Sequence, residues 1–133
     1  MSKERELFNA ALKVQKNAYA PYSNFLVGAA LRSSSGKIYT GCNVENIAYP
    51  EGTCAEAGAI ASMIAGGDRE IKEITVVADS SKPVAPCGGC RQKISEFGSS
   101  SIVISLATTS GEIISTSLGE LLPGAFDQSF MKL

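Results

Sequence analysis

The sequence predicts a three-layer α/β/α domain with a mixed sheet of about five strands. Segments with helical periodicity alternate with segments typical of strands, which is the pattern of an α/β fold. An early pair of strand segments around a polar turn predicts antiparallel pairing, and a later strand-helix-strand segment predicts parallel pairing. The 133 residues, 44% hydrophobic and 19% charged, fit one globular domain over residues 1–133.

The first half of the chain predicts a helix, a hairpin and a second helix. Apolar residues recur at helical spacing over residues 3–18, before the turn at Pro21. Residues 24–44 predict two strands joined by the turn SSSG. Residues 54–65 predict the second helix, which the glycine pair after it would end.

The second half repeats the alternation. Residues 73–78 form a strand pattern, residues 88–97 a helix pattern that ends at a glycine, and residues 101–108 another strand pattern. Residues 112–117 are a candidate short strand. The remainder, residues 117–133, is expected to be a loop with helical turns.

Composition and charge limit the classes of protein to which the chain could belong. No apolar run approaches the ~20 residues of a membrane helix, and the charged N-terminus has no secretory pattern, so we expect a cytoplasmic protein. The net charge of −1 and the pI near 5.5 indicate no basic surface for nucleic acid. A small-molecule substrate is therefore expected.

Four cysteines in a reducing compartment are more typical of metal ligands, catalytic groups or core residues than of disulfides. Cys87 and Cys90 form a C-x-x-C motif at a predicted helix start, a pattern shared by zinc sites and redox dithiols. The long polar loop over residues 79–86 weakens the redox interpretation. Cys54 also begins a predicted helix, where free N–H groups favour a thiolate. Cys42, on a predicted strand, is expected to be a small buried apolar residue.

Three cysteine ligands leave one coordination position open, which is the pattern of a catalytic zinc. Glu56 then has two interpretations. Thr53 and Glu56 match a capping box, in which the Glu56 carboxylate would accept from the Thr53 backbone N–H. With Cys54 as a ligand, Glu56 would instead lie close enough to exchange protons with a zinc-bound water, which is the interpretation we favour.

The ordered segments PYSNFLVGAAL, GCNVENIAYP, TCAE, PCGGCRQ and ELLPGAF resemble the zinc-dependent nucleoside deaminases, and in particular the small homotetrameric cytidine deaminases that use three cysteines. The resemblance covers nearly the whole chain. It implies one Zn²⁺ per chain, bound by Cys54, Cys87 and Cys90, with Glu56 as the proton shuttle. The implied reaction is hydrolysis of free cytidine and deoxycytidine to uridine and deoxyuridine with release of ammonia, a step of pyrimidine salvage.

The resemblance also implies a substrate site. Asn43 and Glu45 match the pair that binds the ribose hydroxyls, and their spacing on a strand would place both on one face. The backbone of Ala55 and Pro86 would hold the edges of the pyrimidine. Phe25 resembles the aromatic residue beside the ring, although the same position is equally typical of a core residue.

Tyr49 and Phe126 resemble aromatic residues that approach the substrate from neighbouring subunits of a homotetramer. Two other functions stay open: deamination of a cytosine-containing antibiotic of the blasticidin S type, and a non-catalytic zinc-binding protein of the same fold. The N-x-E pair favours an ordinary nucleoside over the antibiotic, and the intact Glu56 argues against a non-catalytic protein.

One position departs from the family pattern. Many members carry an arginine after C-A-E, where this chain has Ala57. Zinc with three thiolates has a formal charge of −1, so a nearby cation would help the bound water to lose a proton. Arg91, directly after Cys90, is the candidate charge-balancing residue, unless it is a solvated residue of the helix.

Overall fold

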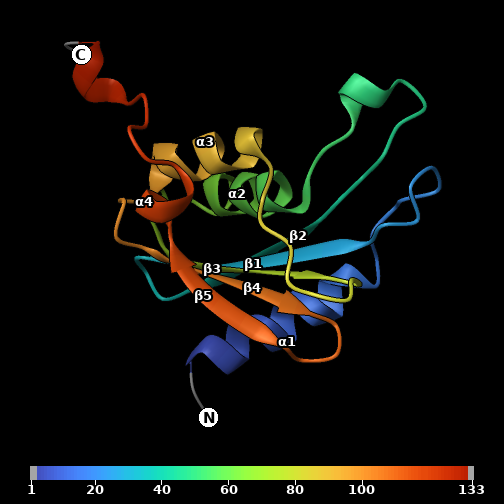
Figure 1. Cartoon of the computed structure of the whole chain (residues 1–133). Helices are drawn as coiled ribbons and strands as arrows, with labels where there is room; N and C mark the ends of the chain where they lie inside the picture. Colours follow the sequence, from blue (N-terminus) through green and yellow to red (C-terminus); the bar gives the residue numbers. More distant parts are fainter. Residues whose placement is uncertain (1–2, 132–133) are drawn as a thin grey trace.

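A five-stranded sheet forms the middle layer of the computed structural model, which describes residues 3–131 (Figure 1). Helix α1 (Lys3–Gln15) covers one face, and α2 (Ala55–Ala65) and α3 (Gly88–Phe97) cover the other. The strands are β1 (Val27–Ser33), β2 (Ile38–Cys42), β3 (Ile71–Ala78), β4 (Val103–Thr108) and β5 (Ile113–Ser117), in the spatial order β2-β1-β3-β4-β5. The predicted three-layer fold with a mixed sheet is confirmed.

Strand pairing follows the predicted mixture. β1 pairs antiparallel with β2 and β3, and β4 pairs antiparallel with β5. β3 and β4 are parallel, and α3 lies in the crossover between them. The SSSG turn between β1 and β2 places Gly36 at φ 89°, the left-handed region that glycine adopts without a steric penalty.

Alternation along the central strands supplies a core on each face of the sheet. Leu31, Ile74 and Ile104 are fully buried on the side of α2 and α3. Their strand neighbours Ala30 and Val77 face α1 on the other side. Each helix layer therefore has its own apolar contact with the sheet.

Two glycines set how closely the helices approach the sheet. A Cβ on Gly28 would lie 2.2 Å from the carbonyl oxygen of Ala11 in α1. A Cβ on Gly41 would lie 2.3 Å from the backbone nitrogen of Ala59 in α2. Because these neighbours are backbone atoms, the contacts require glycine, and the contact at Gly41 fixes α2 against β2.

Two of the bounds that differ from the prediction are set by contacts between distant segments. Helix α1 ends at Gln15 instead of residue 18, because the chain turns to place Tyr19 in an isolated bridge with Val44. β2 ends at Cys42, and Val44 bridges Thr53 instead of continuing a strand.

The connecting segments carry short helical elements. They are η1 (Tyr49–Glu51) in the long β2–α2 connection, and α4 (Leu118–Leu121) and η2 (Gln128–Phe130) in the C-terminal segment. Residues 1–2 and 132–133 of the predicted single domain lie outside the described residues. Within residues 3–131, no helix has the length and apolar character needed to cross a membrane.

Candidate metal centre and active site

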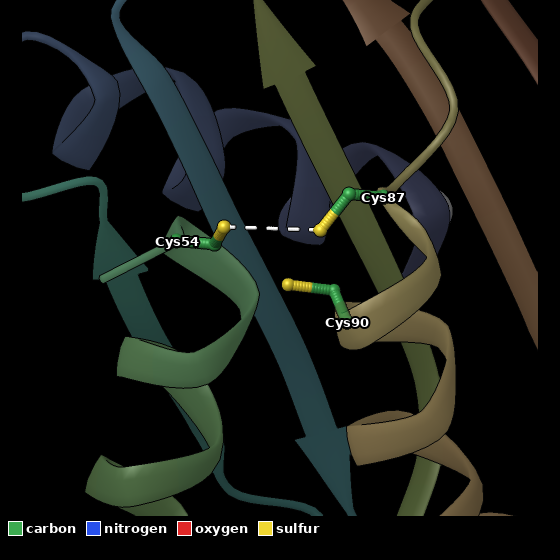
Figure 2. A group of neighbouring side chains, drawn as sticks. All are labelled: Cys54, Cys87 and Cys90. Atoms are coloured by element: carbon green, nitrogen blue, oxygen red, sulfur yellow. Dashed lines mark hydrogen bonds between the residues drawn. The ribbon is translucent and has the colours of Figure 1, made fainter. Parts of the chain in front are cut away.

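Three cysteine thiols meet where α2 and α3 begin side by side (Figure 2). Cys54 is the N-cap of α2, Cys87 is the N-cap of α3, and Cys90 lies in the first turn of α3. Their sulfur atoms all lie within 4.8 Å of one another, and those of Cys54 and Cys87 are 3.9 Å apart. Neither N-cap thiol accepts a capping hydrogen bond, so both are available as ligands.

This geometry fits a zinc ion. Zn–S bonds of about 2.3 Å at tetrahedral angles separate two sulfur ligands by roughly 3.8 Å, close to the observed Cys54–Cys87 distance. Within residues 3–131, these three residues are the one group of cysteine and acidic side chains close enough to hold a metal. Cys42 is not part of the group. It is half-buried on β2, less enclosed than predicted.

The protein environment acts differently on the three thiols. Burial raises the pKa of Cys54 and of Cys90, and the charge of Glu56 adds to the effect at Cys90. At Cys87, the backbone amide of Cys90 lowers the pKa. Zinc binds thiolates, so metal binding must displace protons from Cys54 and Cys90, and zinc affinity will increase with pH.

Glu56 lies in the first turn of α2, with only 4% of its surface exposed. Burial raises the pKa of its carboxyl group, while its own backbone amide, the Cys90 thiol and the charge of Lys93 act in the opposite direction. The capping-box interpretation is wrong. Thr53 donates its N–H to the carbonyl oxygen of Val44 at 2.8 Å, and the helix N-cap is Cys54.

A cavity of about 280 Å³ opens beside the thiols. Its lining includes five residues predicted for the substrate and proton-transfer site: Phe25, Asn43, Ala55, Glu56 and Pro86. Phe25 is 36% exposed at this cavity, so it is not a core residue. The cavity thus lies between an aromatic side chain and the thiol group.

Glu45 lies apart from this cavity. It lines a neighbouring groove with Tyr22, Ser23 and Tyr49. β2 ends at Cys42, so Asn43 and Glu45 follow the strand instead of lying on it. Asn43 accepts from the N–H of Val27 at 2.9 Å and donates to the carbonyl oxygen of Phe25 at 2.8 Å.

The remaining predicted aromatic residues are on projecting segments. Tyr49 is 74% exposed on η1, and Phe126 is 61% exposed in the C-terminal segment, where its ring stacks on Phe130. Figure 1 shows these two segments extending from the body of the molecule at opposite ends. Neither residue lines the cavity beside the thiols.

Arg91 is a half-buried residue rather than a solvated one. Its guanidinium donates to the carbonyl oxygens of Pro86 at 2.7 Å and Leu121 at 2.8 Å. These bonds join the loop before α3 to the end of α4. Lys93, which the sequence reasoning missed, is the cation whose charge acts on Glu56. Lys93 follows Cys90 by three residues, so the two lie on one face of the helix, and this spacing could have indicated a cation near the metal site.

Known proteins share both the fold and the motifs. Residues 1–106 match the family model described as the cytidine and deoxycytidylate deaminase zinc-binding region. A cytidine deaminase of Sporosarcina psychrophila is 46% identical over 92% of this chain and 90% of its own length. The crystal structure of cytidine deaminase from Burkholderia pseudomallei superposes with a TM-score of 0.89 at 44% identity, over 95% of this chain and all of that one.

A blasticidin-S deaminase of Bacillus cereus is also related, at 32% identity over 73% of this chain and 74% of its own length. The cysteine group and the zinc-binding region of the family model agree with one zinc per chain. The chain therefore belongs to the zinc-dependent cytidine and deoxycytidylate deaminase family.

Proposed function

We propose that this enzyme hydrolyses free cytidine and deoxycytidine to uridine and deoxyuridine, with release of ammonia. The observation that supports it most directly is the convergence of Cys54, Cys87 and Glu56 on a cavity that is also lined by Phe25 and Asn43. Such a cavity combines a metal site, a buried proton donor and acceptor, and a wall suited to a planar base.

Cys54, Cys87 and Cys90 would hold the zinc. When bound, zinc would lower the pKa of a water that it holds toward neutrality. Glu56 would accept a proton from the water that attacks C4 of the cytosine ring and deliver it to N3. It would then accept the second proton of that water, now on the C4 hydroxyl, and deliver it to the amino group, so that the C4–N bond breaks and ammonia leaves with a carbonyl formed at C4. The raised pKa of the buried Glu56 suits a group that must both accept and donate protons near neutral pH.

The substrate would be oriented by groups on the cavity wall. Phe25 would lie against the pyrimidine, and the backbone of Ala55 and Pro86 would bind its edges. The Asn43 amide uses one donor and one acceptor position within the chain, which leaves one of each for a sugar hydroxyl. Glu45 would accept from a sugar hydroxyl at the rim.

Assembly would complete the site. We propose a cytoplasmic homotetramer acting in pyrimidine salvage, without nucleic acid or membrane partners, in which residues 1–133 form one domain. The exposure of Tyr49 and Phe126 supports it, because both could reach the cavity of a neighbouring subunit. Sedimentation at assay concentration tests it: a fully active monomer would contradict a shared site.

Absorbance assays with the purified zinc enzyme test the reaction. We expect cytidine and deoxycytidine to lose the absorbance of the amino-pyrimidine while ammonia appears in equal amount. Blasticidin S is the comparison substrate. Turnover of blasticidin S without turnover of cytidine would support the antibiotic deaminase. If the enzyme turns over neither the nucleosides nor blasticidin S, a non-catalytic protein would be supported.

A further inference from the structure

The Glu45 carboxylate is held by the loop that precedes β1. Its Oε1 accepts the backbone N–H groups of Tyr22 at 2.9 Å and Ser23 at 3.2 Å. Its Oε2 accepts the hydroxyl of Ser23. One residue, Ser23, therefore contacts both oxygens of the carboxylate.

These contacts leave little of the carboxylate free. An ionised carboxylate has about four acceptor positions, two on each oxygen. The chain fills both positions on Oε1 and one on Oε2. One acceptor position remains, on the oxygen that the Ser23 hydroxyl fixes. The same hydroxyl is the largest cause of the lowered pKa of Glu45, which keeps the group ionised.

Ser23 also links Glu45 to the cavity wall. Its hydroxyl oxygen accepts the backbone N–H of Phe25 at 3.0 Å, and the Phe25 carbonyl is held by Asn43. The segment from Tyr22 to Phe25 is thus fixed by both predicted ribose-binding residues. Asn24 within it has φ 58°, a left-handed conformation in a turn that these hydrogen bonds maintain.

We propose that Ser23 is a positioning residue for the nucleoside sugar: its hydroxyl holds the Glu45 carboxylate so that one acceptor position on Oε2 faces a sugar hydroxyl. This inference rests on the proposed function, and it adds a residue to which the sequence analysis gave no role. A carboxylate fixed before the ligand arrives loses less conformational entropy on binding, so the hydroxyl of Ser23 contributes to affinity without touching the substrate.

Ser23→Ala tests the proposal. Loss of the hydroxyl should raise KM for cytidine and Kd for the product uridine by about tenfold, with kcat within about twofold, because the hydroxyl contacts groups that bind the nucleoside and none that transfers protons. Ser23→Thr keeps the hydroxyl and should restore both constants. Zinc content and circular dichroism of each variant report whether the fold is intact.

A second serine supplies the matched control. Ser35 is also exposed and donates its hydroxyl to a carboxylate, Asp68, at 2.6 Å, where Ser33 and Tyr39 donate as well. This cluster lies at the β1–β2 turn, at the end of β1 away from Val27. Ser35→Ala should therefore leave KM for cytidine unchanged.

A double-mutant cycle with Glu45→Ala separates positioning from a general effect on the loop. In the Glu45→Ala background, Ser23→Ala should change the uridine Kd by less than about twofold. The proposal is overturned if Ser23→Ala has wild-type KM, or if its full effect persists without Glu45. If the unmodified enzyme neither deaminates cytidine nor binds uridine, both the proposed function and this inference fail. Normal turnover with an unaffected Ser23→Ala variant removes the inference alone.

Discussion

Replacement of Glu56 by glutamine is the most direct test of the proton-transfer role. Glutamine has nearly the same size and fits the same buried position, where 4% of the glutamate is exposed, but it does not exchange a proton near neutral pH. One positioned acid or base contributes about 10²–10⁴ to a rate. Since Glu56 would serve more than one transfer, kcat should fall by at least this factor, equivalent to about 3–5 kcal/mol of barrier.

The stability of the same variant has a predicted sign. Burial raises the pKa of Glu56 above its unfolded value of 4.5, so the folded state favours the protonated form. The stability that this preference supplies is complete below the unfolded pKa and is lost as pH rises through the folded pKa. In the zinc-free protein near neutral pH, Glu56→Gln should therefore unfold at the same or a higher temperature than the unmodified chain.

Steady-state deamination of cytidine, zinc content and thermal unfolding measure these effects together. Glu70→Gln is a matched control, because Glu70 is exposed and pairs with the exposed Lys72; it should retain normal kcat. If Glu56→Gln keeps its zinc and deaminates cytidine at nearly the normal rate, the assignment of proton transfer to Glu56 is wrong.

Four further outcomes are expected. Cys42→Ser should leave one zinc per chain by elemental analysis, whereas serine at any of the three ligands should remove it; equal loss in Cys42→Ser would refute the three-ligand site. Gly41→Ala should lower the free energy of unfolding in urea by at least about 1–3 kcal/mol, because its Cβ would lie 2.3 Å from a backbone nitrogen of α2. The hydroxyl groups that donate to Asp68, of which Ser35 has the largest effect, lower its pKa below the unfolded value of 3.8. The stability that they supply is therefore present above pH 3.8 and is lost as pH falls through the folded pKa. Asp68→Asn should make the free energy of unfolding in urea less dependent on acid pH, and an unchanged dependence would count against a stabilising role of these hydrogen bonds. Arg91→Ala should lower kcat, because the zinc site loses a positive charge next to Cys90, and should lower the melting temperature, because two carbonyl groups lose their donor; wild-type kcat would refute the charge role, and a wild-type melting temperature would show that these bonds contribute nothing.

Local sequence patterns were sufficient for most of the fold. The helix predicted over residues 88–97 matches α3, and the helix predicted over residues 54–65 differs from α2 by one residue at its start. Helix signals of this kind depend on side chains a few positions apart. The bounds that were wrong, at Gln15 and Cys42, are set by the bridges of Val44 with Tyr19 and Thr53. Those contacts join distant segments and leave no periodic signal.

In the candidate site, too, the features set by nearby residues were predictable, and those set by contacts between distant segments were not. Cys54 and Cys87 were predictable as ligands because each is placed by the start of its own helix. The partners of Glu45 were not, since a carboxylate that binds the backbone of Tyr22 and Ser23 has no sequence pattern. The capping box failed for a similar reason: the Thr53 N–H that it needs is already bonded to Val44.

The negative charge of the metal site must be offset by positive groups whose positions the sequence alone does not give. Three thiolates with Zn²⁺ and an ionised Glu56 give two formal negative charges, and Arg91 is the nearest cation in the sequence. Its guanidinium nevertheless bonds to the carbonyls of Pro86 and Leu121, and it is Lys93 whose charge lowers the pKa of Glu56. Lys93 is exposed, so solvent screens it more than a buried arginine beside the sulfurs would be screened. The ends of α2 and α3 supply about half a positive charge each at Cys54 and Cys87. With Ala57 in the position of the family's arginine, we expect compensation at this site to come from the two helix termini, from Lys93 on the face of α3 that carries Cys90, and from Arg91, which keeps its charge when it donates to carbonyl groups.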